Sequence, residues 1–288
     1  MSAPPFTDAG WRRTNLGHLL FAATGKIIAA KLRVVHGAGF PRVTDAQVAL
    51  FRVLDRNGAR LTALAARAGL TKQAMIELVD KAERDGLVTR LPDAEDRRAK
   101  IVALTPRGRD LRAAARAGAA AAERAFAADV GEASVTAVRR ALVFLAPEVD
   151  RSADSERALA AAAGHFVRDV LAAVHRHGHR DVTEALLALF RTLDLEGSRL
   201  TEVAAAARVT KQSMRSLIER AELLGLVERT PDPSDGRARI IRFSQAGRAM
   251  LEEMRHGVAA AEADFARTAG EAALDDLKTG LSRYLAAP

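Results

Sequence analysis

The sequence predicts a mainly α-helical protein with small β-hairpins, an α+β fold built from two tandem copies of one domain. Residues 51–111 align with residues 190–250 at a constant offset of 139 residues, without a gap and with about half of the positions identical. This period is too long for a solenoid repeat, which is typically about 20–50 residues. Only 4% of the residues are aromatic whereas 49% are hydrophobic, so the cores must consist mainly of aliphatic side chains, which favours packed helices. We expect a first repeat over residues 1–147 and a second over residues 148–288.

Helical periodicity and helix-end signals predict the first half of each repeat. In the first repeat, apolar residues at helical spacing predict a long helix over 16–35, followed by a helix over 44–55. Thr62 is expected to cap a short helix that ends before Gly69, and Thr71 to cap the next helix, which would end at Gly86. The two short helices separated by a Gly-containing turn predict a helix-turn-helix unit.

The second half of each repeat begins with a change of period. Residues 87–91 and 100–104 are short β-like runs around a polar turn, which predicts a hairpin. A helix is expected to start at Thr105, whose counterpart in the second repeat is Ser244, and a last helix to end at Leu145. Residues 146–155 form the linker between repeats, and about nine residues reach at most ~30 Å.

The positive charge of the chain lies mainly in the first repeat. The chain has 44 Lys and Arg against 36 Asp and Glu, a formal net charge of +8. Residues 1–147 carry 24 basic and 14 acidic residues, whereas residues 148–288 carry 20 and 22. A basic chain fits a polyanionic partner such as nucleic acid, although a general abundance of Arg in the coding sequence contributes to it.

Several function classes are excluded or disfavoured. The chain has no Cys, which excludes disulfides, thiolate catalysis and Cys-based zinc sites. No apolar run approaches the ~18–20 residues of a membrane span and the start of the chain has no signal sequence, so we expect a cytoplasmic protein. No nucleophile elbow, phosphate loop or zinc-protease motif occurs, so we expect no enzyme and no cofactor.

The helix that follows Thr71 divides into two faces. We expect its buried face to contain Met75, Leu78, Val79 and Ala82, and the second repeat to bury Met214, Leu217, Ile218 and Ala221. Outward residues at the helix N-terminus suit DNA, because Gln can pair with adenine and Lys with guanine or phosphate. A solvated helix face is the alternative for any one helix. The predicted DNA-contacting residues are Thr71, Lys72, Gln73, Ile76 and Lys81 in the first repeat, and Thr210, Lys211, Gln212, Arg215, Ser216 and Arg220 in the second.

The hairpin after this helix strengthens the prediction, because both copies have a basic tip. A basic wing beside a recognition helix can reach phosphate or the adjacent minor groove. Two carboxylates, Asp96 and Asp235, each precede an Arg by two residues, and we expect them to orient that guanidinium through a bidentate pair. The predicted wing contacts are Arg97, Arg98 and Lys100, with Arg237 and Arg239.

These motifs resemble the MarR family of winged-helix transcription regulators. The resemblance is carried by Thr-Lys-Gln-Ala-Met at 71–75, by Gly-Leu-Val-Thr-Arg-Leu-Pro-Asp-Ala-Glu-Asp-Arg-Arg-Ala-Lys at 86–100 and by Leu-Thr-Pro-Arg-Gly-Arg at 104–109. It implies two tandem winged helix-turn-helix domains with a shared helical dimerisation-like core. Because the family is usually a homodimer, it also implies a monomeric single-chain pseudo-dimer that binds two half-sites of double-stranded DNA. The copies differ at the reading positions, where Ile76 becomes Arg215 and Glu77 becomes Ser216, so we expect unequal half-sites.

The same resemblance implies a small, anionic or aromatic effector that relieves repression, bound between the dimer helices and the winged domain. The candidate ligand contacts are Trp11, His18, His36, Arg112, His165 and His175, each of which could instead be a packing or surface residue. The run His175, His177 and His179 is better explained as a solvated loop than as a metal site. Two hypotheses stay open: a ligand-responsive DNA-binding regulator, and a winged-helix scaffold that binds protein or bends DNA without an operator.

Overall fold

The computed structural model describes residues 14–55, 57–93, 96, 98–150, 152–207 and 209–288, except for the side chains of residues 236 and 237. The chain forms two compact units, one of Gly25–Asp129 and one that joins Met1–Thr24 to Val130–Pro288. The second unit therefore includes helix α7 (Glu132–Leu145), which belongs to the first repeat by sequence but packs against helices of the second. The repeat boundary between residues 147 and 148 stays a prediction from the sequence.

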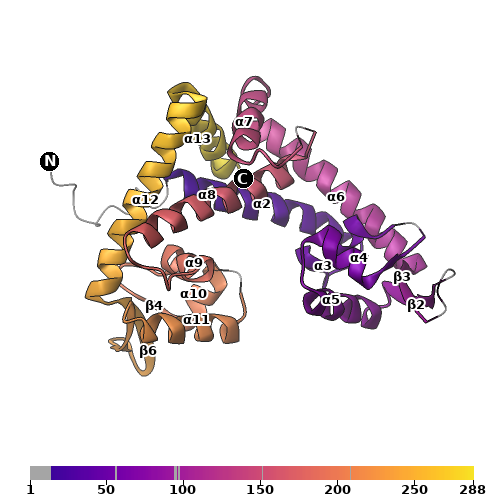
Figure 1. Cartoon of the computed structure of the whole chain (residues 1–288), viewed down its shortest axis with the longest axis horizontal. Helices are drawn as coiled ribbons and strands as arrows, with labels where there is room; N and C mark the ends of the chain where they lie inside the picture. Colours follow the sequence, from indigo (N-terminus) through magenta and orange to yellow (C-terminus); the bar gives the residue numbers. More distant parts are fainter. Residues whose placement is uncertain (1–13, 56, 94–95, 97, 151, 208) are drawn as a thin grey trace. The chain divides into compact units, whose positions relative to one another are not determined.

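The winged domain of the first repeat lies in the unit Gly25–Asp129. It contains α2 (Leu16–Gly37) from residue 25 onward and then, in chain order, α3 (Asp45–Val53), β1 (Ala59–Arg60), α4 (Leu61–Ala68), α5 (Lys72–Arg84), β2 (Val88–Pro92), β3 (Lys100–Leu104) and α6 (Pro106–Val130). The three strands form an antiparallel sheet in the order β1-β3-β2, with Val88 opposite Leu104 and Leu91 opposite Ile101. Figure 1 shows α3, α4 and α5 gathered beside the hairpin. The core between them is mainly aliphatic and also contains Phe residues; Phe51, Leu64, Met75 and Val79 are buried in it.

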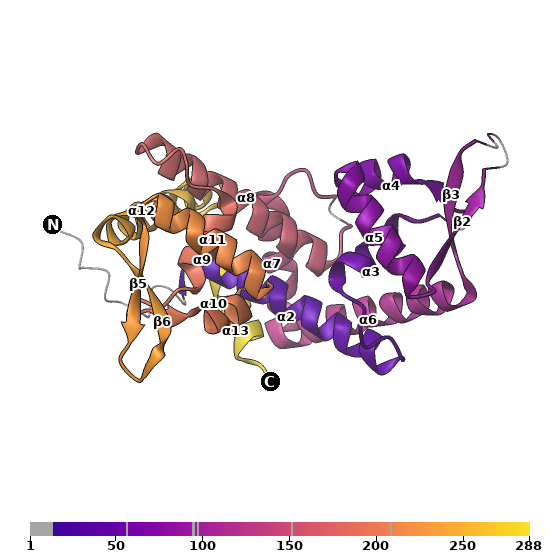
Figure 2. The same cartoon turned by 90° about the horizontal axis from the view of Figure 1, so that it is seen from below.

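The second repeat builds the same domain within the other unit. Its elements are α8 (Ser155–Arg176), α9 (Glu184–Thr192), β4 (Ser198–Arg199), α10 (Leu200–Ala206), α11 (Lys211–Leu223), β5 (Val227–Asp232), β6 (Asp235–Phe243), α12 (Gln245–Ala269) and α13 (Glu271–Ala286). The strand order β4-β6-β5 repeats the first sheet. Within each winged domain the hairpin projects beyond its helices, as Figure 2 shows. The described residues are thus mainly helical with two small antiparallel sheets, which confirms the predicted fold class.

Two local features differ from the sequence prediction. The short helix α4 begins at Leu61, and Arg60, not Thr62, is the N-cap residue, with extended backbone and no side-chain cap. Arg60 is extended because it pairs with Ile101 as part of β1, a third strand that the sequence did not predict. A strand of two residues is too short to show a period of two. The same strand recurs as β4 in the second repeat.

The Leu-Thr-Pro-Arg-Gly-Arg motif at the start of α6 is explained by the contacts of its Thr and its Gly. Thr105 Oγ1 donates to Gly86 O at 2.7 Å and accepts the N–H of Gly108 at 3.0 Å, so one side chain caps α6 and holds it against the end of α5. Ser244 makes the same two contacts in the second repeat. A Cβ added at Gly108 would lie 1.9 Å from Leu87 O, and one added at Gly247 would lie 1.9 Å from Leu226 O. No larger residue fits either position.

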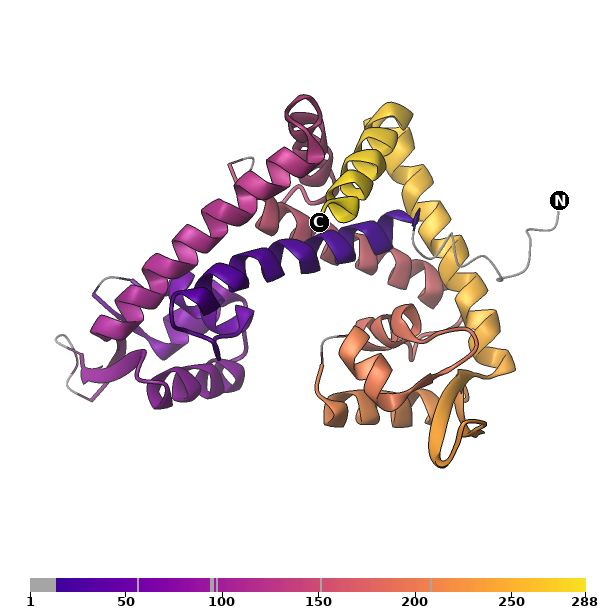
Figure 3. The same ribbon diagram turned by 180° about the vertical axis from the view of Figure 1, so that it is seen from behind.

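Long helices complete the unit that contains the second repeat. Helix α8 packs along α12, and α13 packs against both α7 and α12, as Figure 3 shows from behind. The α7–α13 contact is close, because a Cβ added at Gly280 would lie 2.4 Å from Val138 Cγ2. Phe144 and Phe265 meet edge to face with ring centroids 5.7 Å apart. Among the helices of the described residues, none combines the length and the apolar content needed to cross a membrane.

Candidate nucleic-acid interface

The N-termini of helices α5 and α11 carry the predicted reading residues. Thr71 Oγ1 accepts the N–H of Ala74 at 3.2 Å, and Thr210 Oγ1 accepts that of Ser213 at 3.0 Å. The hydroxyl of each Thr therefore caps its helix and satisfies one amide of the first turn. The following Lys and Gln residues are exposed in both copies, namely Lys72, Gln73, Lys211 and Gln212. Both copies thus present the same polar trio at the positive end of a helix.

The predicted buried faces of these helices are mostly confirmed. Three of the four residues expected in each core are buried, and the fourth, Leu78 or Leu217, is half-buried and packs at the edge. Of the predicted outward residues, Ile76 and Lys81 are half-buried. Arg215, Ser216 and Arg220 are exposed, and Arg220 Nη2 lies 3.9 Å from Asp181 Oδ1.

The two reading faces differ in how their Gln side chain is held. Gln73 Nε2 donates to Glu77 Oε1 at 3.1 Å, which uses one of the two N–H groups with which this amide could donate to a base. In the second repeat Ser216 stands at the position of Glu77, and its hydroxyl donates to the backbone O of Gln212 at 3.3 Å. Within the described residues the side-chain amide of Gln212 makes no hydrogen bond. The second repeat therefore presents its Gln with no carboxylate attached to it.

An arginine on the first strand of each wing joins the wing to the recognition helix. Arg90 on β2 pairs with both Asp80 and Glu83 of α5, and its backbone N–H donates to Glu83 Oε1 at 3.2 Å. The hydrogen bond that the Arg90 guanidinium donates to Asp80 is the main cause that raises the pKa of Arg90. In the second repeat Arg229 Nη2 lies 3.1 Å from Glu222 Oε2. Helix and wing are thus linked in each domain, more tightly in the first.

The wing tips present basic side chains, as far as the structure describes them. Arg98, Lys100 and Arg239 are exposed. Arg97 and the side chain of Arg237 lie outside the described residues. Asp96 Oδ1 accepts the backbone N–H of Arg98 at 3.0 Å. The predicted bidentate pair with the Arg98 guanidinium is therefore corrected: this carboxylate shapes the turn through the backbone, because it lies only two residues before its partner.

A different carboxylate, which the sequence reading missed, holds an arginine at the base of each wing. Arg60 Nε donates to Asp93 Oδ2 at 2.6 Å, and Arg199 Nε donates to Asp232 Oδ2 at 2.7 Å. Ser234 adds its N–H and hydroxyl to Asp232 Oδ1, and these bonds together with Arg199 lower the pKa of Asp232 to about 2. Asp235 contributes by charge to the raised pKa of Arg199, after the larger effect of Asp232. The identical residues at equal spacing in both copies were the available signal.

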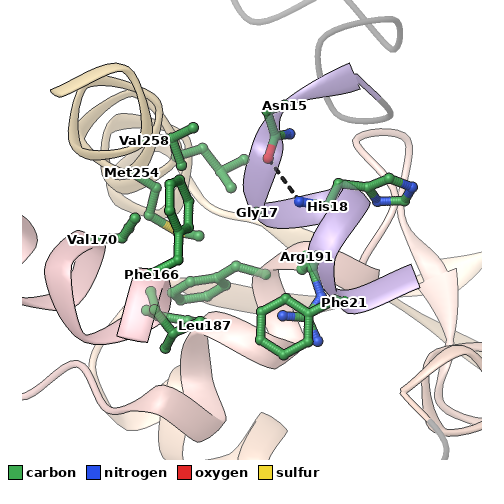
Figure 4. A pocket seen from close by; sticks show the side chains of 13 residues that line it. Asn15, Gly17, His18, Phe21, Phe166, Val170, Leu187, Arg191, Met254 and Val258 are labelled. Carbon is green, nitrogen blue, oxygen red and sulfur yellow. Dashed lines mark hydrogen bonds between the residues drawn. The ribbon is translucent and has the colours of Figure 1, made fainter. Parts of the chain in front are cut away.

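A pocket lies within the unit that contains the second repeat, between the first turns of α2 and helices α8, α9 and α12 (Figure 4). It has a volume of about 630 Å³, which includes space open to solvent. Asn15 caps α2 through the N–H of His18 at 2.9 Å, which places His18 at the pocket wall. Most lining residues are apolar: Phe21, Phe166, Val167, Val170, Leu187, Phe190, Leu251, Met254 and Val258.

Arg191 is the charged residue of this lining. Its Cζ atom lies 3.7 Å from the centroid of the Phe21 ring, a cation–π contact that Figure 4 shows. Desolvation lowers the pKa of Arg191 to about 10, because its guanidinium is largely removed from water. The 13 lining residues include no carboxylate. The pocket therefore suits an apolar molecule, and its charge suits an anionic group.

Of the five predicted ligand contacts that the structure describes, His18 lines this pocket and the other four do not. Trp11 lies outside the described residues, and Arg112 is half-buried on α6. His36 Nε2 lies 2.9 Å from Val43 O and His175 Nε2 lies 2.8 Å from Val182 O, so the two histidines make equivalent contacts that fix helix ends. His165 Nδ1 lies 3.5 Å from Glu148 Oε2. The sequence reading missed Arg191 and the aromatic lining, which are brought together only by packing.

The three-histidine run does not converge on one point. His177 Nδ1 lies 3.0 Å from Ala173 O and 3.4 Å from Glu253 Oε2, whereas His175 contacts the following loop. In the part of the chain that the structure describes, no group of three or more His, Cys, Asp and Glu side chains could hold a metal ion.

A model of the MarR family matches residues 43–99 and 184–238, one stretch in each repeat. A search of curated protein sequences found no match. Among solved structures, a MarR-family transcriptional regulator from Rhodococcus sp. RHA1 is 30% identical, over 37% of this chain and 74% of that chain, with a TM-score of 0.31.

Two further structures are of the repressor CouR. One, bound to a 23-mer DNA duplex, is 29% identical over 39% of this chain and 78% of that chain, with a TM-score of 0.33. The other, from Rhodococcus jostii RHA1 and bound to p-coumaroyl-CoA, is 27% identical over 47% and 94%, with a TM-score of 0.38. The match of the family to both repeats, together with the paired recognition helices and wings, shows that this chain belongs to the MarR family of winged-helix transcription regulators, in a tandemly repeated form.

Proposed function

We propose that this chain is a sequence-specific regulator that binds double-stranded DNA with both winged domains and acts as a repressor relieved by a small molecule. As a single chain with two reading domains, it would act as a monomeric pseudo-dimer. Because the proposed partner is DNA, we place the chain in the cytoplasm, and we propose no enzymatic role for it.

The observation that carries this proposal is the repeated reading surface. Each recognition helix has an intact Thr cap followed by exposed Lys and Gln, and each is joined through an Arg–Glu pair to a wing with exposed basic residues. Phosphate contacts from the wing would fix position, and base contacts from the helix would give specificity. If these residues were only a solvated surface, we would not expect the same three residues in both copies, which differ at about half of their aligned positions.

We further propose two unequal half-sites, centred about 34–36 Å apart on one face of the duplex. The inequality follows from the reading faces. Glu77 holds the amide of Gln73 and adds negative charge beside the phosphates, whereas Arg215 and Ser216 give the second helix a basic, hydrogen-bonding face. The second repeat is therefore expected to contribute more of the sequence discrimination.

The pocket supports the regulatory part of the proposal. Its aromatic and aliphatic wall would bury a flat ring, and the Arg191 guanidinium would pair with a carboxylate or another anionic group. Phe190 lines the pocket and belongs to the same core as Met214 of the recognition helix. A ligand that moved α9 would therefore also disturb the core against which the recognition helix α11 packs.

Selection of bound sequences from a random duplex pool, with light scattering on the winning complex, tests the proposal. We expect one chain on a site with two different half-sites. A strong dependence of affinity on salt is also expected, because Lys and Arg contacts to phosphate release counterions. No enrichment above background, combined with weak salt dependence, would reject the regulator and favour a protein-binding scaffold.

A further inference from the structure

Helices α7 and α13 are the last helices of the two repeats, and they have diverged more than the winged domains. They align at the same offset of 139 residues, yet only Glu132, Ala133 and Leu142 of the 14 residues of α7 recur in α13. About half of the positions are identical between residues 51–111 and 190–250. The two helices pack against each other within one compact unit, as Figure 1 shows. The divergence therefore lies on the surface where the repeats meet.

The tightest contact between these helices joins Gly280 of α13 to Val138 of α7. A Cβ added at Gly280 would lie 2.4 Å from Val138 Cγ2 and 3.4 Å from Val130 Cγ1. At the two matching positions of the repeat, α7 has Ala141 and α13 has Leu277. Both of these residues are buried. The interface thus contains a small and a large residue from each helix, but the residues differ between the helices.

Two copies of α7 would not form this contact. Ala141 would take the place of Gly280, and its Cβ would lie 2.4 Å from Val138 Cγ2, which is closer than any real contact. Because Val is β-branched and has one strongly preferred rotamer in a helix, its methyl group has no free position to which it could turn. The two helices would have to separate and would lose packing contacts along their length.

Two copies of α13 would lose contacts that the unlike pair has. Arg283 Nη1 donates to Ser134 Oγ at 3.4 Å, but α13 has Ala273 at the position of Ser134. Phe144 of α7 meets Phe265 of α12 edge to face, and α13 has Arg283 at the position of Phe144. In addition, α7 carries two Arg and one Glu, whereas α13 carries three acidic and two basic residues. Unlike pairing therefore also gives a small electrostatic attraction.

Each last helix is also linked to the start of the other repeat, by different groups. Arg139 Nε donates to the hydroxyl of Ser155, the first residue of α8, at 3.3 Å. The residue at the position of Arg139 is Lys278, whose Nζ lies 3.1 Å from Glu262 Oε2. Glu262 Oε1 in turn accepts the N–H of Leu16, the first residue of α2, at 2.7 Å. In a pair of first repeats Arg139 would meet Leu16 in place of Ser155, and the side chain of Leu16 has no acceptor.

We infer that α7 and α13 form a heterologous interface that pairs unlike repeats and rejects like ones, so that the partner of each repeat is the other repeat of the same chain. A homodimer interface has to be self-complementary, and the two surfaces described above are complementary only to each other. One consequence rests on the proposed function: every DNA-binding unit contains one reading face of each kind. Two copies of the same reading face would not come together on a palindrome of like half-sites.

The test lets the repeats select their partners. A site-specific protease site is placed within residues 149–153 of the linker, and the folded full chain is cut there. The two fragments are then unfolded in urea and refolded as a mixture, and native mass spectrometry separates unlike from like pairs by mass. In the wild type, unlike pairs should exceed each kind of like pair by about tenfold or more, because overpacking and lost hydrogen bonds both oppose like pairs.

Matched variants exchange the residues of the tightest contact. Leu277→Val with Gly280→Ala gives α13 the residues of α7, and it should lower the preference for unlike pairs by about fivefold or more. Adding Val138→Leu and Ala141→Gly restores an unlike contact with the two helices exchanged, so the preference should return. Circular dichroism of the uncut chains checks their folding. If the first variant does not fold, Val138→Leu with Ala141→Gly alone makes the same comparison without adding a Cβ to the crowded position.

Each result decides the inference. A random mixture of pairs from the wild type, or fragments that refold without pairing, would overturn it. It would also be overturned if the two-residue exchange left the preference unchanged, or if the four-residue exchange did not restore it. The experiment contains no DNA, so failure of the proposed regulator function would appear only in the selection of bound duplexes, whereas failure of the present inference would appear only in the pairing of the fragments.

Discussion

The two winged domains of this chain share several internal contacts and differ most clearly on their reading faces. Both have the Thr cap on the recognition helix, the Arg–Asp pair at the base of the wing and the hydroxyl that ties the next helix to the preceding glycine. They differ at Glu77 and Ser216 on the reading face and at Lys31 and Val170 beside the long helices. Contacts that hold the fold tolerate few substitutes, whereas a surface is free to change with its ligand.

The largest expected effect tests the shared part of the comparison. Gly108→Ala and Gly247→Ala each place a Cβ 1.9 Å from a backbone carbonyl, and each should destabilise its winged domain by about 3 kcal/mol, measured by urea unfolding. Gly164→Ala is the matched control, because a Cβ there meets only the far end of Arg168 at 3.6 Å in the middle of α8. A small gain in stability is expected for the control. Unequal losses of unfolding free energy at Gly108 and Gly247 would show that the two winged domains do not depend equally on this contact.

The next prediction concerns the reading faces. Gln212→Ala should cost about 1–3 kcal/mol of discrimination at one base pair, because its amide is available for a base edge. Gln73→Ala should cost less, because Glu77 already holds that amide. Binding to duplexes with single base changes measures both. Equal losses would contradict the proposed dominance of the second repeat.

A substitution that copies the second repeat into the first sharpens the same point. Glu77→Ser removes a carboxylate from a surface that faces phosphate and releases the Gln73 amide, so it should tighten DNA binding by about 1 kcal/mol or less. The gain should be larger at low salt. The reverse change, Ser216→Glu, should weaken DNA binding by a similar amount. If the two substitutions did not change the affinity in opposite directions, the proposed difference between the two reading faces would be contradicted.

The wings should contribute evenly and without sequence preference. Arg98→Ala and Arg239→Ala should each lower affinity for all duplexes and reduce the slope of log affinity against log salt by about 1. Arg267→Ala, which removes an exposed charge from α12 next to Asp264, is the control and should leave the slope unchanged. Arg237→Ala, predicted from the sequence alone, belongs to the same series.

The smallest effect is a pH dependence of the second wing. The pKa of Asp232 is lowered to about 2, whereas an unfolded Asp titrates near about 4. Its stabilising contribution is therefore fully present above about pH 4 and is lost as the pH falls through about 2. The urea midpoint of Asp232→Asn should lie below that of the wild type at pH 5, and the two should converge towards pH 2. Asp264→Asn on α12 controls for the loss of a carboxylate elsewhere. If the urea midpoints of the wild type and Asp232→Asn differed by the same amount at every pH, the lowered pKa would not belong to Asp232.

Much of the fold could be predicted because its signals are local. The Thr caps, the glycines after the helices and the change from helical to alternating period each involve a few neighbouring residues, and the structure places the helices and hairpins within a few positions of the prediction. The strand at Ala59–Arg60 was missed because two residues show no period. The reading residues could be predicted because they follow from one amphipathic helix. Of the predicted ligand contacts, four described residues lie away from the pocket, and Trp11 lies outside the described residues.

By itself, the sequence determined that one domain occurs twice, which helix faces outward and where the charge accumulates, since these depend on spacing within single elements. Only the tertiary structure decided that Arg60 pairs with Asp93, that Lys31 is buried against Asp45 and that Arg191 meets Phe21 in a pocket. Each of these contacts joins residues on different elements. Their meeting depends on how helices and strands pack, and packing leaves no periodic trace along the chain.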